Sequence, residues 1–203
     1  MQAPDQSETQ KRRHLSGLDR FLADSEVLSR LTDCQVGLLT NHASTTCDGI
    51  PASKALHDRL CATGGRPIRL FTPEHGIQLA AGAGETVDHG TDPLTGLQVR
   101  SLYAHGRLDD DATFGAIDTL VIDLRDIGVR CYTYAATAAR AARTALDRNI
   151  EVIICDRPNP LGPDTDGPRP VAGRHCARTD NCGTFDPLGQ SPRNRKPLFR
   201  LSR

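Results

Sequence analysis

Carboxylate side chains beside apolar runs are the groups in this 203-residue sequence with the clearest potential for acid–base chemistry. Glu74 and His75 stand in the string Pro-Glu-His-Gly, directly after a short apolar run that ends at Thr72. A carboxyl group at the end of a buried strand is shielded from water and retains its proton more readily, which suits a general acid. A helix cap or a structural ion pair is the alternative role for such a glutamate. Glu74 is therefore the first candidate for a catalytic residue.

Asp126 is the second candidate, and it ends the string Asp-Leu-Arg-Asp after another apolar run. If the strand ends just before it, Asp126 projects into the loop over the sheet edge, as a second acid or base or as an acceptor for a sugar hydroxyl. Arg130, Tyr132 and Tyr134 follow, although aromatic residues make up only 4% of the chain. Aromatic faces and phenol hydroxyls suit polyhydroxyl ligands, but core tyrosines at a helix N-terminus would show the same spacing.

Two further polar strings follow apolar runs in the same way. Asn41 and His42 come after the first run, and Asp156 and Asn159 belong to the string Asp-Arg-Pro-Asn-Pro. Each pair could bind a ligand or fix a turn through local hydrogen bonds, and the two prolines favour the turn in the second string. Because ligands bind beyond the carboxyl ends of parallel strands, the repetition predicts one crevice lined from several strands.

The elements that must position these residues follow from the apolar spacing. The sequence predicts helices over 14–31 (with a break near Asp24), 53–62 and 132–149, and strands over 35–40, 68–72, 97–103, 118–124 and 151–155. A Gly-rich stretch at 76–96 has little periodicity, which is typical of a functional loop. Alternating strands and helices predict an α/β fold over 14–168, with a Rossmann-like, mainly parallel sheet and helices on both faces.

The two ends of the chain differ from this pattern. Residues 1–13 are polar and predicted to be disordered, and residues 169–203 show no helix or strand period, which predicts an irregular tail. No Gly-x-Gly-x-x-Gly string follows the first strand, so a nicotinamide cofactor is not expected. The chain also lacks the Gly-x-Ser-x-Gly and Gly-Lys-Ser/Thr motifs, which excludes serine-hydrolase and P-loop NTPase classes.

Composition narrows the possible partners. The 25 basic residues balance the 25 acidic ones, so neither nucleic acid nor an anionic membrane surface is an expected partner. None of the seven cysteines forms a Cys-x-x-Cys pair, which favours reduced, buried thiols and predicts no metal and no other cofactor. The N-terminus lacks the apolar core of a signal peptide, and no apolar run is long enough to cross a bilayer. As written, the sequence predicts a cytoplasmic protein.

Taken in order, the strings resemble the NamZ family of exo-β-N-acetylmuramidases, also called YbbC-like and formerly a domain of unknown function. The likeness runs from about residue 17 to residue 168 and is carried by Leu-Leu-Thr-Asn-His at 38–42, Phe-Thr-Pro-Glu-His-Gly at 71–76, Val-Arg-Ser-Leu-Tyr at 99–103, Asp-Leu-Arg-Asp-Ile-Gly-Val-Arg-Cys-Tyr-Thr-Tyr at 123–134 and Asp-Arg-Pro-Asn-Pro-Leu-Gly at 156–162. The resemblance implies a glycoside hydrolase that releases N-acetylmuramic acid from the non-reducing end of peptidoglycan fragments. It implies Glu74 as the catalytic acid, with other motif positions at the site: Asn41, His75, Asp126, Arg130 and Tyr132.

The resemblance also implies a second, smaller α/β domain, with the active cleft between the two domains. In this sequence the irregular tail stands where that domain is expected, so the chain is predicted to be truncated and to supply one wall of the cleft. Many family members are exported, whereas no signal peptide is present here. Three interpretations stay open. The first is a muramyl-sugar hydrolase, inactive if its partner catalytic group belongs to the other domain, and the second is a non-catalytic carbohydrate-binding domain. The third is a fragment that does not fold stably, because loss of a domain interface exposes apolar surface.

Overall fold

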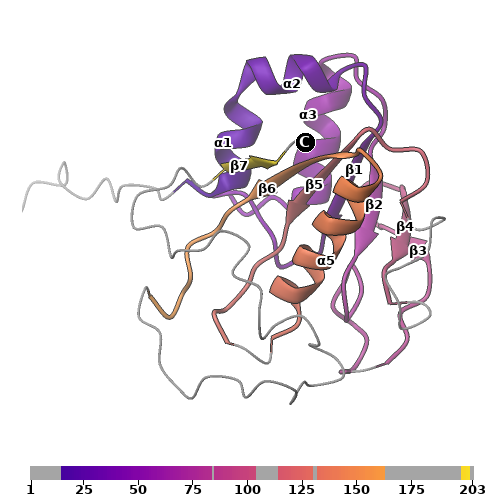
Figure 1. Cartoon of the computed structure of the whole chain (residues 1–203), viewed down its shortest axis with the longest axis vertical. Helices are drawn as coiled ribbons and strands as arrows, with labels where there is room; N and C mark the ends of the chain where they lie inside the picture. The colour runs from indigo at the N-terminus through magenta and orange to yellow at the C-terminus, as the bar shows by residue number, and fades with distance from the viewer. Residues whose placement is uncertain (1–14, 84, 104–113, 130–131, 163–197, 202–203) are drawn as a thin grey trace, which may run out of the picture.

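Seven strands and four helices make up the described part of the chain, which in this computed structural model is residues 15–83, 85–103, 114–129, 132–162 and 198–201 (Figure 1). The helices are α1 (Gly17–Ala23), α2 (Ser25–Leu31), α3 (Ala52–Ala62) and α5 (Tyr134–Asp147). The strands are β1 (Val36–Thr40), β2 (Arg69–Thr72), β3 (Gly90–Thr91), β4 (Gln98–Ser101), β5 (Thr119–Asp123), β6 (Glu151–Cys155) and β7 (Leu198–Leu201).

All seven strands belong to one sheet, in the order β3-β4-β2-β1-β5-β6-β7. The five inner strands are parallel, and β1 lies between β2 and β5 with Leu38 opposite both Leu70 and Val121. From β1 the chain builds outward through β2 to β4 and then crosses back to begin β5 beside β1. The strand order therefore reverses between β1 and β5, and ligand crevices form beyond the strand ends at such a switch point.

Helices cover both faces of the sheet, as Figure 1 shows with α5 on one side and α1, α2 and α3 on the other. On the α1–α3 side, fully buried helix residues such as Phe21 and Leu56 pack in one cluster with the strand residues Leu38 and Val121. On the other side, α5 presents a row of small side chains to Leu120, Ile122 and Val152: Ala141, Ala142 and Ala145. These features confirm the predicted α/β fold with a mainly parallel sheet.

The break predicted near Asp24 is present and has a local cause. The Asp24 carboxylate accepts hydrogen bonds from the backbone N–H groups of Glu26 and Val27, both at 3.1 Å, and so caps α2. Ser16 and Asp19 form a reciprocal capping box at the start of α1. Because each helix has its own cap, the segment folds as two short helices, and both pack on the same face of the sheet.

Two strands were not predicted from the sequence. The two-residue strand β3 lies inside the Gly-rich stretch and runs antiparallel to β4. Strand β7 runs antiparallel to β6, although it lies in the segment expected to be irregular. Strands of two and four residues are too short to show a period, and pairing to an existing sheet edge defines them. The predicted helix at 132–149 begins later, at Tyr134. Residues 1–13 and most of the predicted tail lie outside the described residues.

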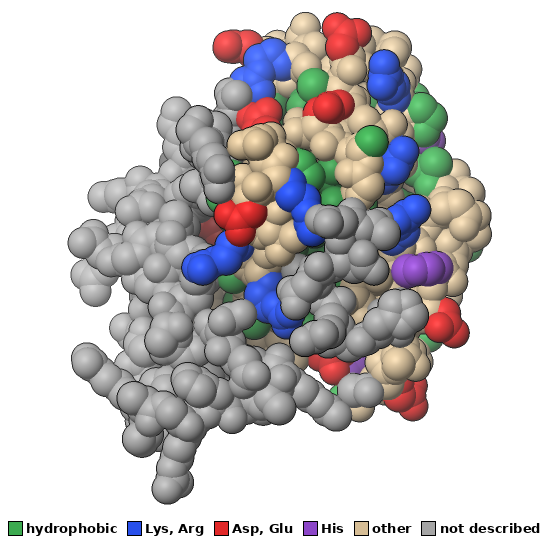
Figure 2. Space-filling view, turned by 45° about the vertical axis from the view of Figure 1, so that its right-hand side comes forward, with side chains coloured by type: hydrophobic (Ala, Val, Ile, Leu, Met, Phe, Trp, Pro, Cys, Tyr) green, Lys and Arg blue, Asp and Glu red, His purple; other side chains and the backbone are tan. Residues whose placement is uncertain are grey.

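The surface drawn in Figure 2 mixes basic and acidic side chains among the described residues, with apolar side chains visible only in small areas. This distribution agrees with the balanced formal charge of the chain. None of the helices among the described residues is both long and apolar enough to span a bilayer.

Candidate active site

Glu74 lies just beyond the carboxyl end of β2 and is only 5% exposed. Its Oε2 accepts a 2.7 Å hydrogen bond from the Thr133 hydroxyl, and its backbone carbonyl accepts a long, 3.5 Å hydrogen bond from the Tyr134 hydroxyl. Thr133 is the N-cap of α5, but its hydroxyl makes no cap hydrogen bond within the helix. The start of α5 therefore fixes Glu74, and the partial positive charge of a helix N-terminus faces its carboxylate.

Tyr132, Tyr134 and Asn41 surround this glutamate. The two tyrosine rings contact edge to face, with centroids 4.6 Å apart at 61°. Burial raises the pKa of Tyr134, and the neighbouring Tyr132 and Glu74 add to the effect, so its hydroxyl is a neutral donor. Asn41 is 1% exposed, and its Oδ1 accepts from the Ala43 N–H. Its Nδ2 makes no close hydrogen bond to a described residue, although the Asn41 side chain interacts with the Tyr134 hydroxyl. The buried Asn41 amide therefore lies beside the tyrosine that contacts Glu74.

His75 and Gly76 shape the turn that follows Glu74. Both have a positive φ, 72° for His75 and 80° for Gly76, and a β-carbon at Gly76 would lie 3.2 Å from Val87 Cγ1. The left-handed conformation of His75 is strained for a residue with a β-carbon. A contact of 2.8 Å between His75 Nδ1 and the Ala81 carbonyl oxygen stabilises it. The predicted ligand His75 is thus also a structural anchor of the Gly-rich loop.

His42 serves the same loop from the end of β1. Its Nε2 lies 3.0 Å from Oδ1 of Asp92, which is fully buried, and its backbone N–H donates to the Ile77 carbonyl. Burial alone would raise the pKa of Asp92, but hydrogen bonds from Thr95, the Leu94 backbone, His42 and other donors hold it below its ordinary value. His42 therefore joins β1 to the loop through an ionised carboxylate.

Asp126 and Asn159 meet across a glycine. Asp126 Oδ1 accepts a 2.6 Å hydrogen bond from the Gly128 N–H, and its buried Oδ2 has no hydrogen-bond partner among the described residues. Gly128 has φ 73°, and a β-carbon there would lie 2.6 Å from Cγ of Asn159. Asn159 Oδ1 in turn accepts from the Leu161 N–H. The loops after β5 and β6 are thereby packed together, with the Asn159 amide lying on the Gly128 backbone.

Arg157 and Asp123 form a buried ion pair at the switch point that sequence reasoning did not single out as functional. The Nε and Nη2 atoms of Arg157 each donate to one carboxylate oxygen of Asp123 at 2.7 Å, and Nη2 also donates to the Thr45 carbonyl at 2.9 Å. Burial alone would lower the pKa of Arg157, but the hydrogen bonds and charge of Asp123 raise it. Arg157 belongs to the string Asp-Arg-Pro-Asn-Pro, from which the sequence predicts Asp156 and Asn159 as site residues.

Asp156, the neighbour chosen from that string, has a mainly structural position. Its backbone carbonyl accepts a 2.8 Å hydrogen bond from the N–H of Gly17, which ties the end of β6 to the start of α1. Burial raises the pKa of its half-buried carboxyl group. Arg130, the remaining predicted ligand, lies outside the described residues.

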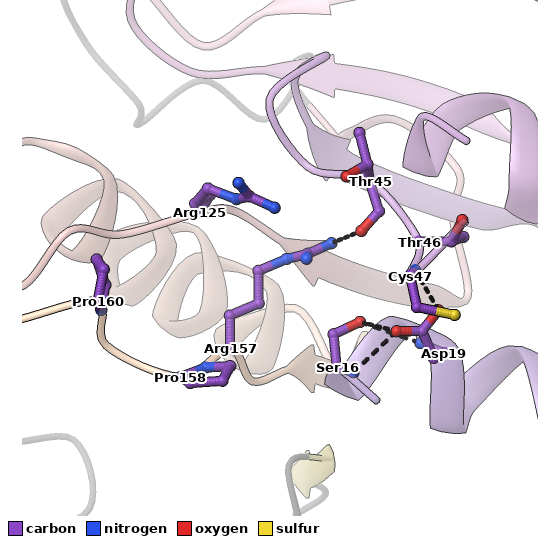
Figure 3. Close-up of a pocket in the computed structure, with 9 residues that line it drawn as sticks. All are labelled: Ser16, Asp19, Thr45, Thr46, Cys47, Arg125, Arg157, Pro158 and Pro160. Atoms are coloured by element: carbon purple, nitrogen blue, oxygen red, sulfur yellow. Dashed lines mark hydrogen bonds between the residues drawn. The ribbon is translucent and has the colours of Figure 1, made fainter. Parts of the chain in front are cut away.

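Two cavities open at the carboxyl edge of the sheet. One, of about 270 Å³, lies at the switch point and is lined by Arg125, Arg157 and residues of the loop after β1, among others (Figure 3). The other, of about 280 Å³, lies against the Gly-rich loop and includes His75 and Thr72, whose buried hydroxyl has no partner among the residues that the structure describes. Glu74 lines neither cavity. It follows β2, which lies between β4 and β1 in the sheet. Among the described residues, no three His, Cys, Asp or Glu side chains gather as metal ligands.

The structure thus separates the predicted site residues into three groups. Glu74, Asn41, Tyr132 and Tyr134 lie together, with Thr133 as the added member that connects α5 to the glutamate. Asp126 and Asn159 form a second group across Gly128. The third consists of the two histidines, which hold the Gly-rich loop.

A family model and a curated protein both match more than half of the chain. Residues 36–175 match the family model described as the N-terminal part of the exo-β-N-acetylmuramidase NamZ. The chain is 33% identical over 147 residues to the peptidoglycan β-N-acetylmuramidase NamZ of Bacillus subtilis (strain 168), a match that covers 72% of this chain and 34% of that protein.

Two solved structures of DUF1343 family proteins from Bacteroides fragilis NCTC 9343 share the fold. One has a TM-score of 0.65 at 30% identity and covers 82% of this chain and 41% of its own. The second has a TM-score of 0.61 at 25% identity and covers 81% and 40%. The chain spans about a third to two fifths of the length of these relatives. Because the family model covers more than half of its residues, the chain belongs to the NamZ family, of which it carries the N-terminal domain.

Proposed function

We propose that this domain forms one wall of the active site of a glycoside hydrolase that removes N-acetylmuramic acid from the non-reducing end of peptidoglycan fragments, with Glu74 as its catalytic acid. The observation that carries the proposal is the setting of Glu74, a buried carboxyl group at a strand end whose Oε2 is fixed by the Thr133 hydroxyl. The family of the chain and the activity for which the Bacillus subtilis relative is named support the substrate class.

In this proposal, protonated Glu74 gives its proton to the glycosidic oxygen as the bond to the leaving group breaks. Most glycoside hydrolases need a second carboxylate to act as the nucleophile or to activate water. Asp126 is the proposed second group, since Oδ1 is held by Gly128 while Oδ2 has no partner in the part of the chain that the structure describes. The separation of the two carboxyl groups in the complete cleft sets whether the configuration at the sugar is retained or inverted.

Tyr132 and Asn41 are proposed to bind the sugar. The partly exposed Tyr132 ring offers an apolar face for the sugar ring, and it is held at a fixed angle by Tyr134. The Asn41 Nδ2 atom, which makes no close hydrogen bond to a described residue, offers a donor to a substrate hydroxyl or to the acetamido carbonyl. Arg130, His75 and His42 remain proposed ligands on the strength of their motif positions alone.

The test compares the chain with a chimaera in which its residues 1–168 are joined to the part of the Bacillus subtilis relative that they do not match. Release of a chromogenic aglycone from an N-acetylmuramide is measured for both proteins, each with and without Glu74→Gln. The control is Glu26→Gln, which changes an exposed glutamate on α2. We expect release by the chimaera, its loss in Glu74→Gln and its retention in Glu26→Gln.

Two results would contradict the proposal. If the folded chimaera released no aglycone, the hydrolase assignment would fail, and if Glu74→Gln retained full activity, the role of Glu74 would fail. If both the chain and the chimaera bound the sugar without releasing aglycone, the result would instead support the second candidate, a non-catalytic carbohydrate-binding domain. This candidate keeps the polar strand ends as sugar contacts and needs no second catalytic group.

A further inference from the structure

The cavity at the switch point is lined by the ends of three strands that are neighbours in the sheet. Thr45, Thr46 and Cys47 come from the loop after β1, Arg125 follows β5, and Arg157 follows β6. Figure 3 shows the Arg125 and Arg157 side chains running toward the same end of the cavity, near Thr45. Two guanidinium groups of like charge therefore share one wall of a small cavity.

These two arginines differ in how their charges are balanced. Arg157 is 8% exposed and is neutralised by its bidentate contact with Asp123, while its Nη1 makes no hydrogen bond to a described residue. Arg125 is exposed and makes no hydrogen bond or ion pair with any described residue. Arg125 is thus the guanidinium of this wall that has no ion-pair partner among the described residues, although the Asp123 carboxylate lies within its electrostatic reach.

The acidic residue in the cavity lining, Asp19, makes its hydrogen bonds to groups other than Arg125. Asp19 Oδ2 accepts hydrogen bonds from the Ser16 backbone and hydroxyl, and its Oδ1 accepts from the Cys47 N–H at 2.9 Å. Both carboxylate oxygens are therefore directed to the backbone of the neighbouring loop and to a helix cap. A free guanidinium beside a second guanidinium, with donors directed into a cavity, is an arrangement that binds a carboxylate.

We propose that this cavity binds the lactyl carboxylate of an N-acetylmuramic acid residue through Arg125, and so distinguishes that sugar from N-acetylglucosamine, which lacks the group. The inference rests on the proposed function, because it assigns the acidic part of the same substrate. The positions fit one sugar residue: Glu74 follows β2 and Arg125 follows β5, two strand spacings apart, or about 10 Å along the sheet edge, and an arginine side chain covers part of that span.

The test is calorimetric titration of the full chain with three probes: N-acetylmuramic acid, its lactyl methyl ester and N-acetylglucosamine. The variant Arg125→Gln removes the charge of an exposed side chain, and the control Arg66→Gln removes one at the opposite end of β2. We expect N-acetylmuramic acid to bind at least about 10-fold more tightly than the other two sugars, as loss of a charge-assisted hydrogen bond predicts. Arg125→Gln should abolish this preference, and Arg66→Gln should retain it.

A preference that survives in Arg125→Gln would overturn the inference, as would equal binding of the three sugars or no binding of N-acetylmuramic acid by the unaltered chain. Circular dichroism of Arg125→Gln confirms that the comparison is made on a folded protein. Failure of the proposed hydrolysis is recognised separately. It appears as a chimaera that releases no aglycone, whereas failure of this inference appears in the binding preference, which Glu74→Gln should leave intact.

Discussion

Replacing Arg157 by methionine, whose side chain is also long and unbranched, removes the guanidinium from the buried ion pair with Asp123. This substitution should destabilise the domain strongly. The lost partner leaves an uncompensated carboxylate in a site where Asp123 is 0% exposed, a loss of about 3–5 kcal/mol. The hydrogen bond to the Thr45 carbonyl adds about 0.5–1.5 kcal/mol. The expected total, about 4–6 kcal/mol, is a large part of the stability of an ordinary domain.

The same protein offers a matched control. Arg30 contacts Glu151 at 3.3 Å, but the two side chains are 37% and 20% exposed. Because an exposed ion pair contributes about 0–1 kcal/mol, Arg30→Met should change the free energy of unfolding very little. Adding Asp123→Asn to the Arg157→Met variant should recover part of the loss, since the amide carries no charge to bury.

The pH dependence of the effect has a defined sign. Without Arg157, burial raises the folded-state pKa of Asp123 above its unfolded value of about 3.9. A carboxyl group with a raised folded pKa destabilises the fold above the unfolded value, and protonation relieves this as the pH falls. The deficit of Arg157→Met relative to the unaltered chain should therefore shrink on acidification.

Urea unfolding followed by circular dichroism, at about pH 7 and about pH 5, measures both effects. The argument would be refuted if Arg157→Met cost no more than Arg30→Met at the higher pH. It would also be refuted if the deficit grew as the pH was lowered.

Three further predictions concern the loops and the glutamate. Gly128→Ala should lower the free energy of unfolding by about 1–2 kcal/mol more than Gly49→Ala, because both positions have a positive φ but only the first β-carbon would meet another side chain; equal losses in urea would contradict this. Asp92→Asn should be destabilised at neutral pH and converge with the unaltered chain in acid, since a lowered folded pKa gives stability that is present above about pH 3.9 and lost below it; thermal unfolding across pH checks this. Thr133→Val removes the hydroxyl donor to Glu74 and should lower the free energy of unfolding, measured by thermal unfolding, by about 1–2 kcal/mol. Thr133→Ser keeps the hydroxyl and should retain the stability of the unaltered chain.

The central parallel strands β1 and β5 could be predicted from the sequence because each is a short, mostly apolar run that is buried throughout. Leu38 and Val121 lie in such runs, and burial on both faces of a parallel sheet requires this composition. The edge strand β3 could not be predicted in this way. Its residues, Gly90 and Thr91, are exposed, and β4 alone makes them a strand.

The site was partly predictable for a related reason. A strand end can be recognised from local sequence, so Glu74 and Asn41 were placed at the correct edge of the sheet. Their partners depend on contacts between distant segments: Thr133 is 59 residues from Glu74, and Arg157 is 34 residues from Asp123. No local pattern distinguishes which polar residue of a string will reach across the sheet edge.

The antiparallel strands β3 and β7 have a consequence for the behaviour of the domain in concentrated solution. A long parallel strand with a bare edge offers a template on which another chain can add by backbone hydrogen bonding. In this sheet both outer positions are held by short strands, Gly90–Thr91 on one side and Leu198–Leu201 on the other. An incoming chain would meet only a few backbone groups at either side, so the apolar central strands are protected from edge-to-edge aggregation.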